Sequence, residues 1–231
     1  MISLQAQRFS RMGYAVLIVD LYGTGDSEGE FGKVTWDMWQ NSLDQAWQWL
    51  RDQQGISAVH LWGVRLGCLL ALDSIRTFKW PVRSYLFWQP VTNGDRFVTQ
   101  LMRLRIAEQF GQKKQDSVKD LRQSSAAGES LEIAGYLVNA KLLQTIAALN
   151  TEVLTPTSGT LVHWLECSTA EPSEMLPGSQ KIINHWQQAS VAVRSACVNG
   201  PSFWNSVEIE EVPELLEKSC TLFAEVADGR D

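Results

Sequence analysis

Residues that bind metals are scarce in this sequence. Its 231 residues include three histidines and four cysteines, and no two cysteines form a C-x-x-C pair. No spacing of the kind that gathers ligands around one zinc ion is present. We therefore expect no metal site and no cofactor. The cysteines are expected to be free thiols, as is typical of proteins in the reducing cytoplasm.

Long apolar runs and an excess of positive charge are also absent. No run approaches the ~20 apolar residues that a membrane-spanning helix needs, and the polar N-terminus does not have the pattern of a signal peptide. The 26 acidic and 20 basic residues give a net charge of −6, which argues against nucleic-acid binding. The composition thus predicts a cytoplasmic protein with no membrane span and no nucleic-acid partner.

Apolar residues make up 45% of the chain, enough for a large buried core. Short apolar runs typical of buried strands alternate with segments whose apolar residues recur at spacings of three and four, which is typical of helices. Strands are expected at residues 14–19, 58–62, 85–88, 160–165 and 191–198, and helices at 3–12, 35–50, 97–110, 140–149, 182–188 and 213–223. This alternation predicts an α/β protein with a doubly wound, mostly parallel sheet.

The segment 93–150 interrupts the alternation. It contains two of the expected helices, a polar stretch at 111–117 and an alternating piece at 131–137. We interpret this segment as a cap inserted over the carboxyl ends of the strands, where doubly wound sheets bind their ligands. Residues 1–92 and 151–231 would then form the core domain.

The most informative motif is the pentapeptide GVRLG at residues 63–67. It lies between an expected strand and an expected helix, which is the setting of the G-x-S-x-G nucleophile elbow of α/β-hydrolases. Gly63 and Gly67 are expected to allow the sharp turn. Between them stands Arg65, where a hydrolase has the serine that attacks its substrate. The frame of a hydrolase site is therefore present without its nucleophile.

The histidine of a catalytic triad is also missing. It should follow the last strand, but residues 199–204 contain none. His60 and His163 lie within expected strands, and His185 lies on an expected helix, so each is better explained as a packed or surface residue. Because losing the nucleophile or the base costs on the order of a millionfold in rate, we do not expect ordinary triad catalysis.

Three other side chains could support unconventional chemistry. Asp20 and Glu166 follow expected strands and could activate a water molecule as general bases. Cys68 lies three residues beyond Arg65, where a cation and a helix N-terminus would lower a thiol pKa, although no base is evident nearby. The sequence alone leaves these alternatives open.

Arg65 allows two interpretations. Its guanidinium could pair with a buried carboxylate such as Asp20 or a glutamate, which would give it a structural role. Alternatively, the guanidinium and the free amides of the helix N-terminus could bind a carboxylate or phosphate. Gln89 ends a neighbouring strand and would share that crevice, and Arg96 and Arg103 share one face of the helix that opens the expected cap. We predict that these four residues bind the ligand.

Several segments resemble one family. The loop DLYGTGDS at residues 20–27 resembles the D-x-x-G-x-G-x-S loop of α/β-hydrolases. Further segments, at 61–67, 88–91, 97–105, 134–136 and 201–204, resemble the second family of exosortase A system-associated hydrolases. That family is similar to hydrolases in fold and occurs with exopolysaccharide biosynthesis and exosortase protein sorting. The resemblance implies an α/β-hydrolase-like fold, an arginine at the elbow as a family feature, and a ligand related to acyl, lipid or saccharide chemistry.

The resemblance also implies one departure. Members of the family usually carry additional strands ahead of the helix that opens this chain, including a central strand beside the elbow strand. We therefore expect an α/β-hydrolase-like doubly wound sheet with an inserted helical cap that lacks the N-terminal strands. The sheet should be incomplete near residues 14–20.

Three functions are compatible with these observations. The first is the binding of an anionic acyl- or saccharide-related small molecule through Arg65 beneath the cap, without triad catalysis. The second is hydrolysis of an ester or thioester by an unconventional mechanism. The third is a non-catalytic role as a partner of proteins that assemble exopolysaccharide.

Overall fold

The computed structural model describes the chain except for residues 110–115, 172, 207, 209 and 229–231. Its helices are α1 (Ile2–Arg11), α2 (Trp36–Gln54), α3 (Leu66–Phe78), α4 (Gly94–Glu108), α5 (Val118–Ala126), α6 (Ala140–Ala148), α7 (Pro177–Gln188) and α8 (Pro213–Asp228), with a short 3₁₀ helix η1 (Phe31–Lys33). Its strands are β1 (Val59–Val64), β2 (Val82–Trp88), β3 (Leu131–Ile133), β4 (Tyr136–Val138), β5 (Leu161–Ser168) and β6 (Ala192–Asn199). The part of the polar stretch that covers 111–115 lies outside the described residues.

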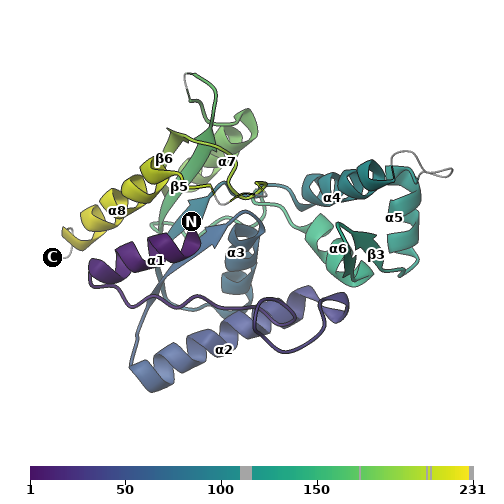
Figure 1. Cartoon of the computed structure of the whole chain (residues 1–231). Coiled ribbons are helices and arrows are strands. Elements are labelled where there is room, and N and C mark those ends of the chain that lie inside the picture. Colours follow the sequence, from purple (N-terminus) through teal and green to yellow (C-terminus); the bar gives the residue numbers. More distant parts are fainter. Residues whose placement is uncertain (110–115, 172, 207, 209, 229–231) are drawn as a thin grey trace.

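Four strands form the central sheet in the order β1-β2-β5-β6, and all of its pairs are parallel. Helix α3 connects β1 to β2, and helix α7 connects β5 to β6, as parallel neighbours require. Figure 1 shows the helices packed around this sheet, with α4, α5 and α6 gathered at one end of the molecule. The predicted α/β class with a doubly wound, mostly parallel sheet is confirmed.

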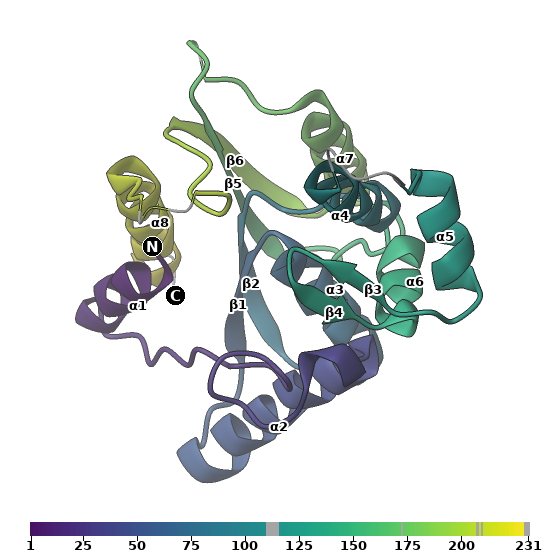
Figure 2. The same ribbon diagram turned by 45° about the vertical axis from the view of Figure 1, so that its right-hand side comes forward.

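Successive residues of a strand point to opposite faces of the sheet. Helices cover both faces, so both sets of side chains are buried. In β2, Tyr85 and Phe87 pack in one buried cluster with residues of α2, α3 and α7. Their neighbours Leu86 and Trp88 pack in a second cluster with residues of α1 and α8. Figure 2 shows α1 and α8 on one side of the strands and α3 and α7 on the other. This double burial explains why the strands are continuous apolar runs in the sequence.

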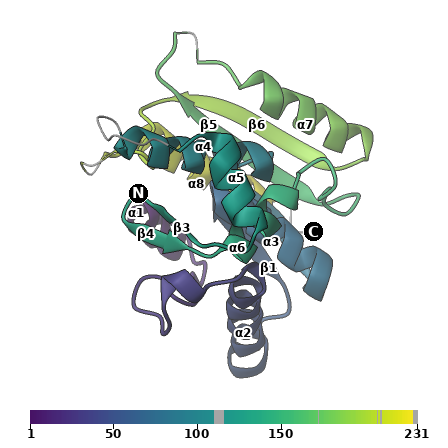
Figure 3. The same cartoon turned by 90° about the vertical axis from the view of Figure 1, so that its right-hand side faces the viewer.

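The segment between β2 and β5 forms a compact group of its own, which Figure 3 shows in front of the sheet. The alternating piece folds as the antiparallel hairpin β3-β4, and Ser117 begins α5 with a capping box that includes Asp120. Helix α4 starts at Gly94, whose backbone lies so close to α6 that a Cβ there would be 1.7 Å from the carbonyl oxygen of Ile146. Only glycine permits this close approach, so α4 and α6 can pack together here only if residue 94 has no side chain.

The expected strand at 14–19 is wrong. This segment is not part of the sheet, and residues 15–20 make no backbone–backbone hydrogen bond within the described chain. Val16, Leu17 and Ile18 are 37%, 44% and 52% exposed, although their β-branched and apolar side chains favour a buried strand. Strand β1 likewise pairs on one edge only, with β2. The expectation of an incomplete sheet near residues 14–20 therefore holds.

His163 occupies an unusual place for a polar residue. It lies within β5, is fully buried, and contacts the ring of Phe223 at 5.9 Å between centroids. Neither of its ring nitrogens has a hydrogen-bond partner among the described residues. Burial, and then the positive charges of Arg194 and His60, lower the pKa of His163 from 6.5 to about 4. The folded protein thus holds this imidazole neutral.

The folded state should therefore be less stable in mild acid than at neutral pH. Between pH 6.5 and about 4 the unfolded chain binds a proton at His163 and the folded chain does not, so the unfolding free energy falls as the pH decreases. We expect a loss of about 1–3 kcal/mol over this range in urea unfolding followed by tryptophan fluorescence. His163→Leu should remove most of this pH dependence, whereas His185→Gln, at an exposed position, should keep it. An equal pH dependence in both variants would contradict this account.

Candidate functional site: an arginine at the nucleophile elbow

Arg65 stands at the sharp turn between β1 and α3. Its backbone has φ 54° and ψ −118°, a conformation that non-glycine residues adopt at a cost of about 1–3 kcal/mol. The turn is held by the Arg65 amide, which donates to the carbonyl of Trp88 at 3.0 Å, and by the Cys68 amide, which donates to the Arg65 carbonyl at 3.1 Å. The chain therefore adopts the strained geometry of an elbow with arginine in the central position.

The two elbow glycines are not equivalent. A Cβ on Gly63 would lie 2.8 Å from the amide nitrogen of Cys68 and 2.9 Å from its Cα, both backbone atoms that cannot move freely. A Cβ on Gly67 would meet nothing within 4 Å. Gly63 is therefore required so that α3 can pack against the end of β1. The space at Gly67 imposes no such constraint.

This difference can be measured directly. Gly63→Ala should destabilise the fold by about 1–3 kcal/mol because the methyl group is forced against backbone. Gly67→Ala is the matched control, and it should be neutral or stabilising by up to ~1 kcal/mol because alanine is favoured over glycine in a helix. Chemical denaturation of both variants tests the expectation. Equal effects would show that the close contact at Gly63 is relieved by movement of the helix.

The guanidinium of Arg65 is half-buried and makes two contacts. Its Nη1 donates to the backbone carbonyl of Gln89 at 3.1 Å, and its Cζ lies 5.1 Å from the ring centroid of Trp204. Burial lowers the pKa of Arg65, and the nearby Cys68 and Glu166 partly oppose this effect. None of the ion pairs among the described residues includes Arg65. The charge is thus held by a carbonyl dipole and an aromatic face.

The structural interpretation, an ion pair between Arg65 and Asp20, is therefore not supported. Asp20 is exposed and accepts a hydrogen bond from the amide of Asp26 at 3.1 Å. A Cβ on Gly25 would lie 2.4 Å from the carboxyl carbon of Asp20, so the loop closes tightly around this side chain. Asp20 orders its own turn and makes no recorded contact with the elbow.

Gln89 does lie at the elbow, as predicted. Its backbone carbonyl accepts from Arg65, and its side-chain Oε1 accepts from the amide of Cys167 at 2.8 Å. Its own amide donates to the carbonyl of Leu165 at 2.8 Å. Gln89 has φ 45°, a second left-handed residue at the carboxyl ends of the strands. It thus connects the elbow to the end of β5.

Glu166 is buried beside the elbow, and both of its oxygens are occupied. Oε1 accepts from the indole nitrogen of Trp164 at 3.0 Å, and Oε2 accepts from the amide of Leu176 at 2.9 Å. At 2% exposure this carboxylate has little access to water. Its surroundings suit a fixed negative charge that partly offsets Arg65 better than a general base.

Cys68 is equally unsuited to nucleophilic attack. It is fully buried, and burial raises the pKa of its thiol well above the usual range despite the nearby positive charge of Arg65. A thiol acts as a nucleophile in its deprotonated form, which these surroundings disfavour. All four cysteines are free, as expected.

Arg96 and Arg103 lie on exposed positions of α4. Within the described residues no hydrogen bond, ion pair or ring contact joins either of them to Arg65, so their predicted part in a common site stays a prediction. No group of three or more histidine, cysteine, aspartate or glutamate side chains within the described chain could hold a metal ion. No helix in that part is long and apolar enough to cross a membrane.

Trp204 is the site residue that sequence analysis missed. It follows β6, in the stretch where a triad histidine was sought and not found. A half-buried tryptophan there places an electron-rich ring against the guanidinium, an interaction worth about 0.5–2 kcal/mol. The sequence does show an aromatic residue where the histidine was sought. It does not show that this residue meets Arg65, because the two positions are 139 residues apart along the chain (204 − 65).

Comparison with known proteins establishes the fold. No family model matches the sequence, and no curated protein matches it. Among solved structures, Est1E from Butyrivibrio proteoclasticus with bound ferulic acid is similar, with a TM-score of 0.67 and 13% identity over 97% of this chain and 82% of that one. Mouse α/β-hydrolase domain-containing protein 10 has a TM-score of 0.61 and 14% identity over 99% and 84% of the two chains.

A structure of the metagenome-derived lipolytic enzymes LipS and LipT is also similar, with a TM-score of 0.61 and 15% identity over 97% of this chain and 87% of that one. At these identities the likeness concerns the fold alone. The protein therefore has the α/β-hydrolase fold. Within that fold, Arg65 stands at the turn between β1 and α3.

Proposed function

We propose that this protein binds an anionic ligand through Arg65 at the elbow and does not use triad catalysis. The observation that carries the proposal is a guanidinium at a strained turn, half-buried and without an ion pair among the described residues. Glu166 offsets this charge only in part and forms no ion pair with Arg65, so an anion that joined the guanidinium directly would relieve the remaining cost of burying it.

The surroundings of Arg65 favour a planar anion such as a carboxylate. A guanidinium offers several N–H groups, and only Nη1 is used by the protein, toward Gln89. Arg65 is the N-cap residue of α3, whose first turn carries the positive end of the helix dipole. The ring of Trp204 lies 5.1 Å from the guanidinium carbon and would contact a ligand bound there.

The chemical class of the ligand follows from the resemblance noted above. We propose an acyl- or saccharide-related anion in the context of exopolysaccharide biosynthesis and exosortase-linked sorting, with the segment 93–150 as a cap above the core formed by 1–92 and 151–231. Arg96 and Arg103 on α4 would add positive charge on the cap side. A role as a non-catalytic partner of exopolysaccharide-assembling proteins would be compatible with the same site.

Ligand-dependent thermal stabilisation tests this proposal. Glucuronate, hexanoate and inorganic phosphate should be titrated at low ionic strength against the wild type, Arg65→Gln and the control Arg83→Gln, which changes an exposed arginine at the start of β2. At tenfold the dissociation constant, the best anion should raise Tm by about 3–5 °C. We expect Arg65→Gln to lose this shift and Arg83→Gln to keep it. Equal shifts in all three proteins would overturn the proposal.

The unconventional-hydrolase alternative has its own test. Wild-type protein should not turn over p-nitrophenyl acetate above background, because Asp20 is tied to its turn and Glu166 is buried with both oxygens occupied. Arg65→Ser alone should also remain inactive, since no histidine follows β6 and loss of the base costs on the order of a millionfold in rate. Turnover that disappears in Asp20→Asn or Glu166→Gln would favour the alternative instead.

A further inference from the structure

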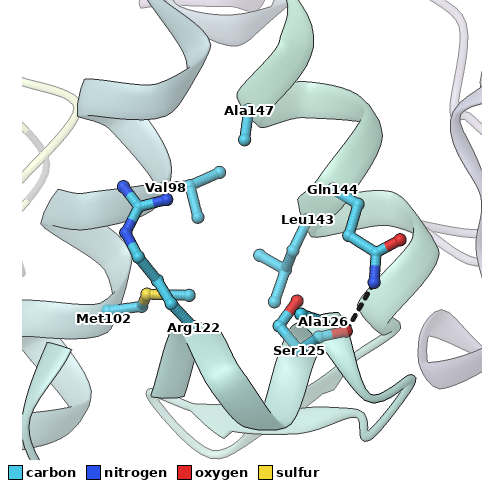
Figure 4. A pocket seen from close by; sticks show the side chains of 8 residues that line it. All are labelled: Val98, Met102, Arg122, Ser125, Ala126, Leu143, Gln144 and Ala147. Carbon is cyan, nitrogen blue, oxygen red and sulfur yellow. Dashed lines mark hydrogen bonds between the residues drawn. The ribbon is translucent and has the colours of Figure 1, made fainter. Parts of the chain in front are cut away.

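A cavity lies within the helical segment, away from the elbow. It has a volume of about 360 Å³, is open to solvent on one side, and is lined by side chains of α4, α5 and α6. This volume falls within the range of about 300–1,000 Å³ that is usual for small-molecule sites. Figure 4 shows the side chains that surround it, namely Val98, Met102, Arg122, Ser125, Ala126, Leu143, Gln144 and Ala147. No residue of the four-stranded sheet is among them.

The lining is mixed: Val98, Met102 and Leu143 are apolar, whereas Arg122, Ser125 and Gln144 carry polar groups. Ser125 is only 4% exposed as a residue, and its hydroxyl has no hydrogen-bond partner among the described residues. Figure 4 shows this hydroxyl directed toward the space beside Leu143. The amide of Gln144 donates to the backbone carbonyl of Ser125, so Gln144 is already engaged. Solvent reaches this hydroxyl within the cavity, so a ligand carbonyl oxygen would accept its hydrogen bond in place of water.

Arg122 supplies a second donor whose charge is already neutralised. Its Nη2 lies 2.7 Å from Oδ1 of Asp95 and 2.7 Å from Oγ1 of Thr99, both on α4. These contacts leave its Nη1 and Nε hydrogens without a recorded partner. The site therefore offers hydrogen-bond donors in an apolar setting, without net charge. A ligand carboxylate would have to compete with Asp95 and lose its hydration, whereas an uncharged carbonyl oxygen would not.

From this arrangement we infer that the cavity binds a short, uncharged acyl compound, an ester or amide with an aliphatic chain. The chain packs against Val98, Met102 and Leu143, and the carbonyl oxygen accepts hydrogen bonds from Ser125 and Arg122. This site is separate from the proposed anion site at Arg65 and prefers ligands of a different charge.

Calorimetric titration with hexanamide, which is uncharged, and hexanoate, which is its anionic counterpart, tests whether the cavity prefers an uncharged ligand. The wild type should bind hexanamide roughly threefold or more tightly than hexanoate, because the paired Arg122 gives the anion no free counter-charge. Ser125→Ala should weaken hexanamide binding roughly threefold to tenfold by removing the donor. Ser124→Ala is the matched control because Ser124 does not line the cavity, and it should leave the affinity unchanged.

Two further variants separate the cavity from the elbow. Ala147→Phe should fill the cavity and abolish hexanamide binding, and Ala126→Phe, at an exposed position on the rim, should do the same if Ala147→Phe does not fold. Arg65→Gln should bind hexanamide like the wild type. Undetectable hexanamide binding in the wild type, unchanged binding in the filled variants, or tighter binding of hexanoate would each overturn the inference.

Discussion

The hydrogen bonds at the carboxyl ends of β1, β2 and β5 hold the site together. The Arg65 amide donates to the end of β2, the Gln89 amide donates to the carbonyl of Leu165, and the Gln89 side chain accepts from the amide of Cys167 on β5. Two residues with left-handed backbone, Arg65 and Gln89, are fixed by these bonds. Because three strands end in one hydrogen-bonded unit, the guanidinium is held where a hydrolase would hold its nucleophile.

The residues gathered at this elbow are not those of a catalytic triad. Catalysis by a triad needs a nucleophile, a base and an acid within hydrogen-bond reach. Here Arg65 stands in the first position, Trp204 lies in the segment where the base is expected, and Glu166 is a buried, fully hydrogen-bonded carboxylate. Arg65 is thus a half-buried cation with an aromatic face on Trp204 and the charge of Glu166 as a partial offset.

Much of the fold could be predicted from local pattern, and the failures have a common physical cause. The apolar runs that became β2 and β5 are buried on both faces, so their composition predicted strands correctly, whereas β6 is largely exposed or half-buried and was found by its alternation with the helices. The segment 14–19 has the same composition but forms no strand, because a strand needs backbone hydrogen bonds to a neighbour as well as apolar side chains. The local sequence of a segment does not specify whether a second strand is present to pair with it.

The sequence by itself determined the strand–turn–helix frame at residues 63–67, the arginine within it and the absence of a histidine after the last strand. Each of these depends on residue identity and local spacing. Only the tertiary structure decided what Arg65 contacts, since Gln89 and Trp204 reach it from two other places in the chain and the charge of Glu166 acts on it from a third. It also decided that Asp20 is not its counter-ion, and that Ser125 lines a cavity between three helices. Those outcomes follow from packing and charge balance in space, which local sequence does not specify.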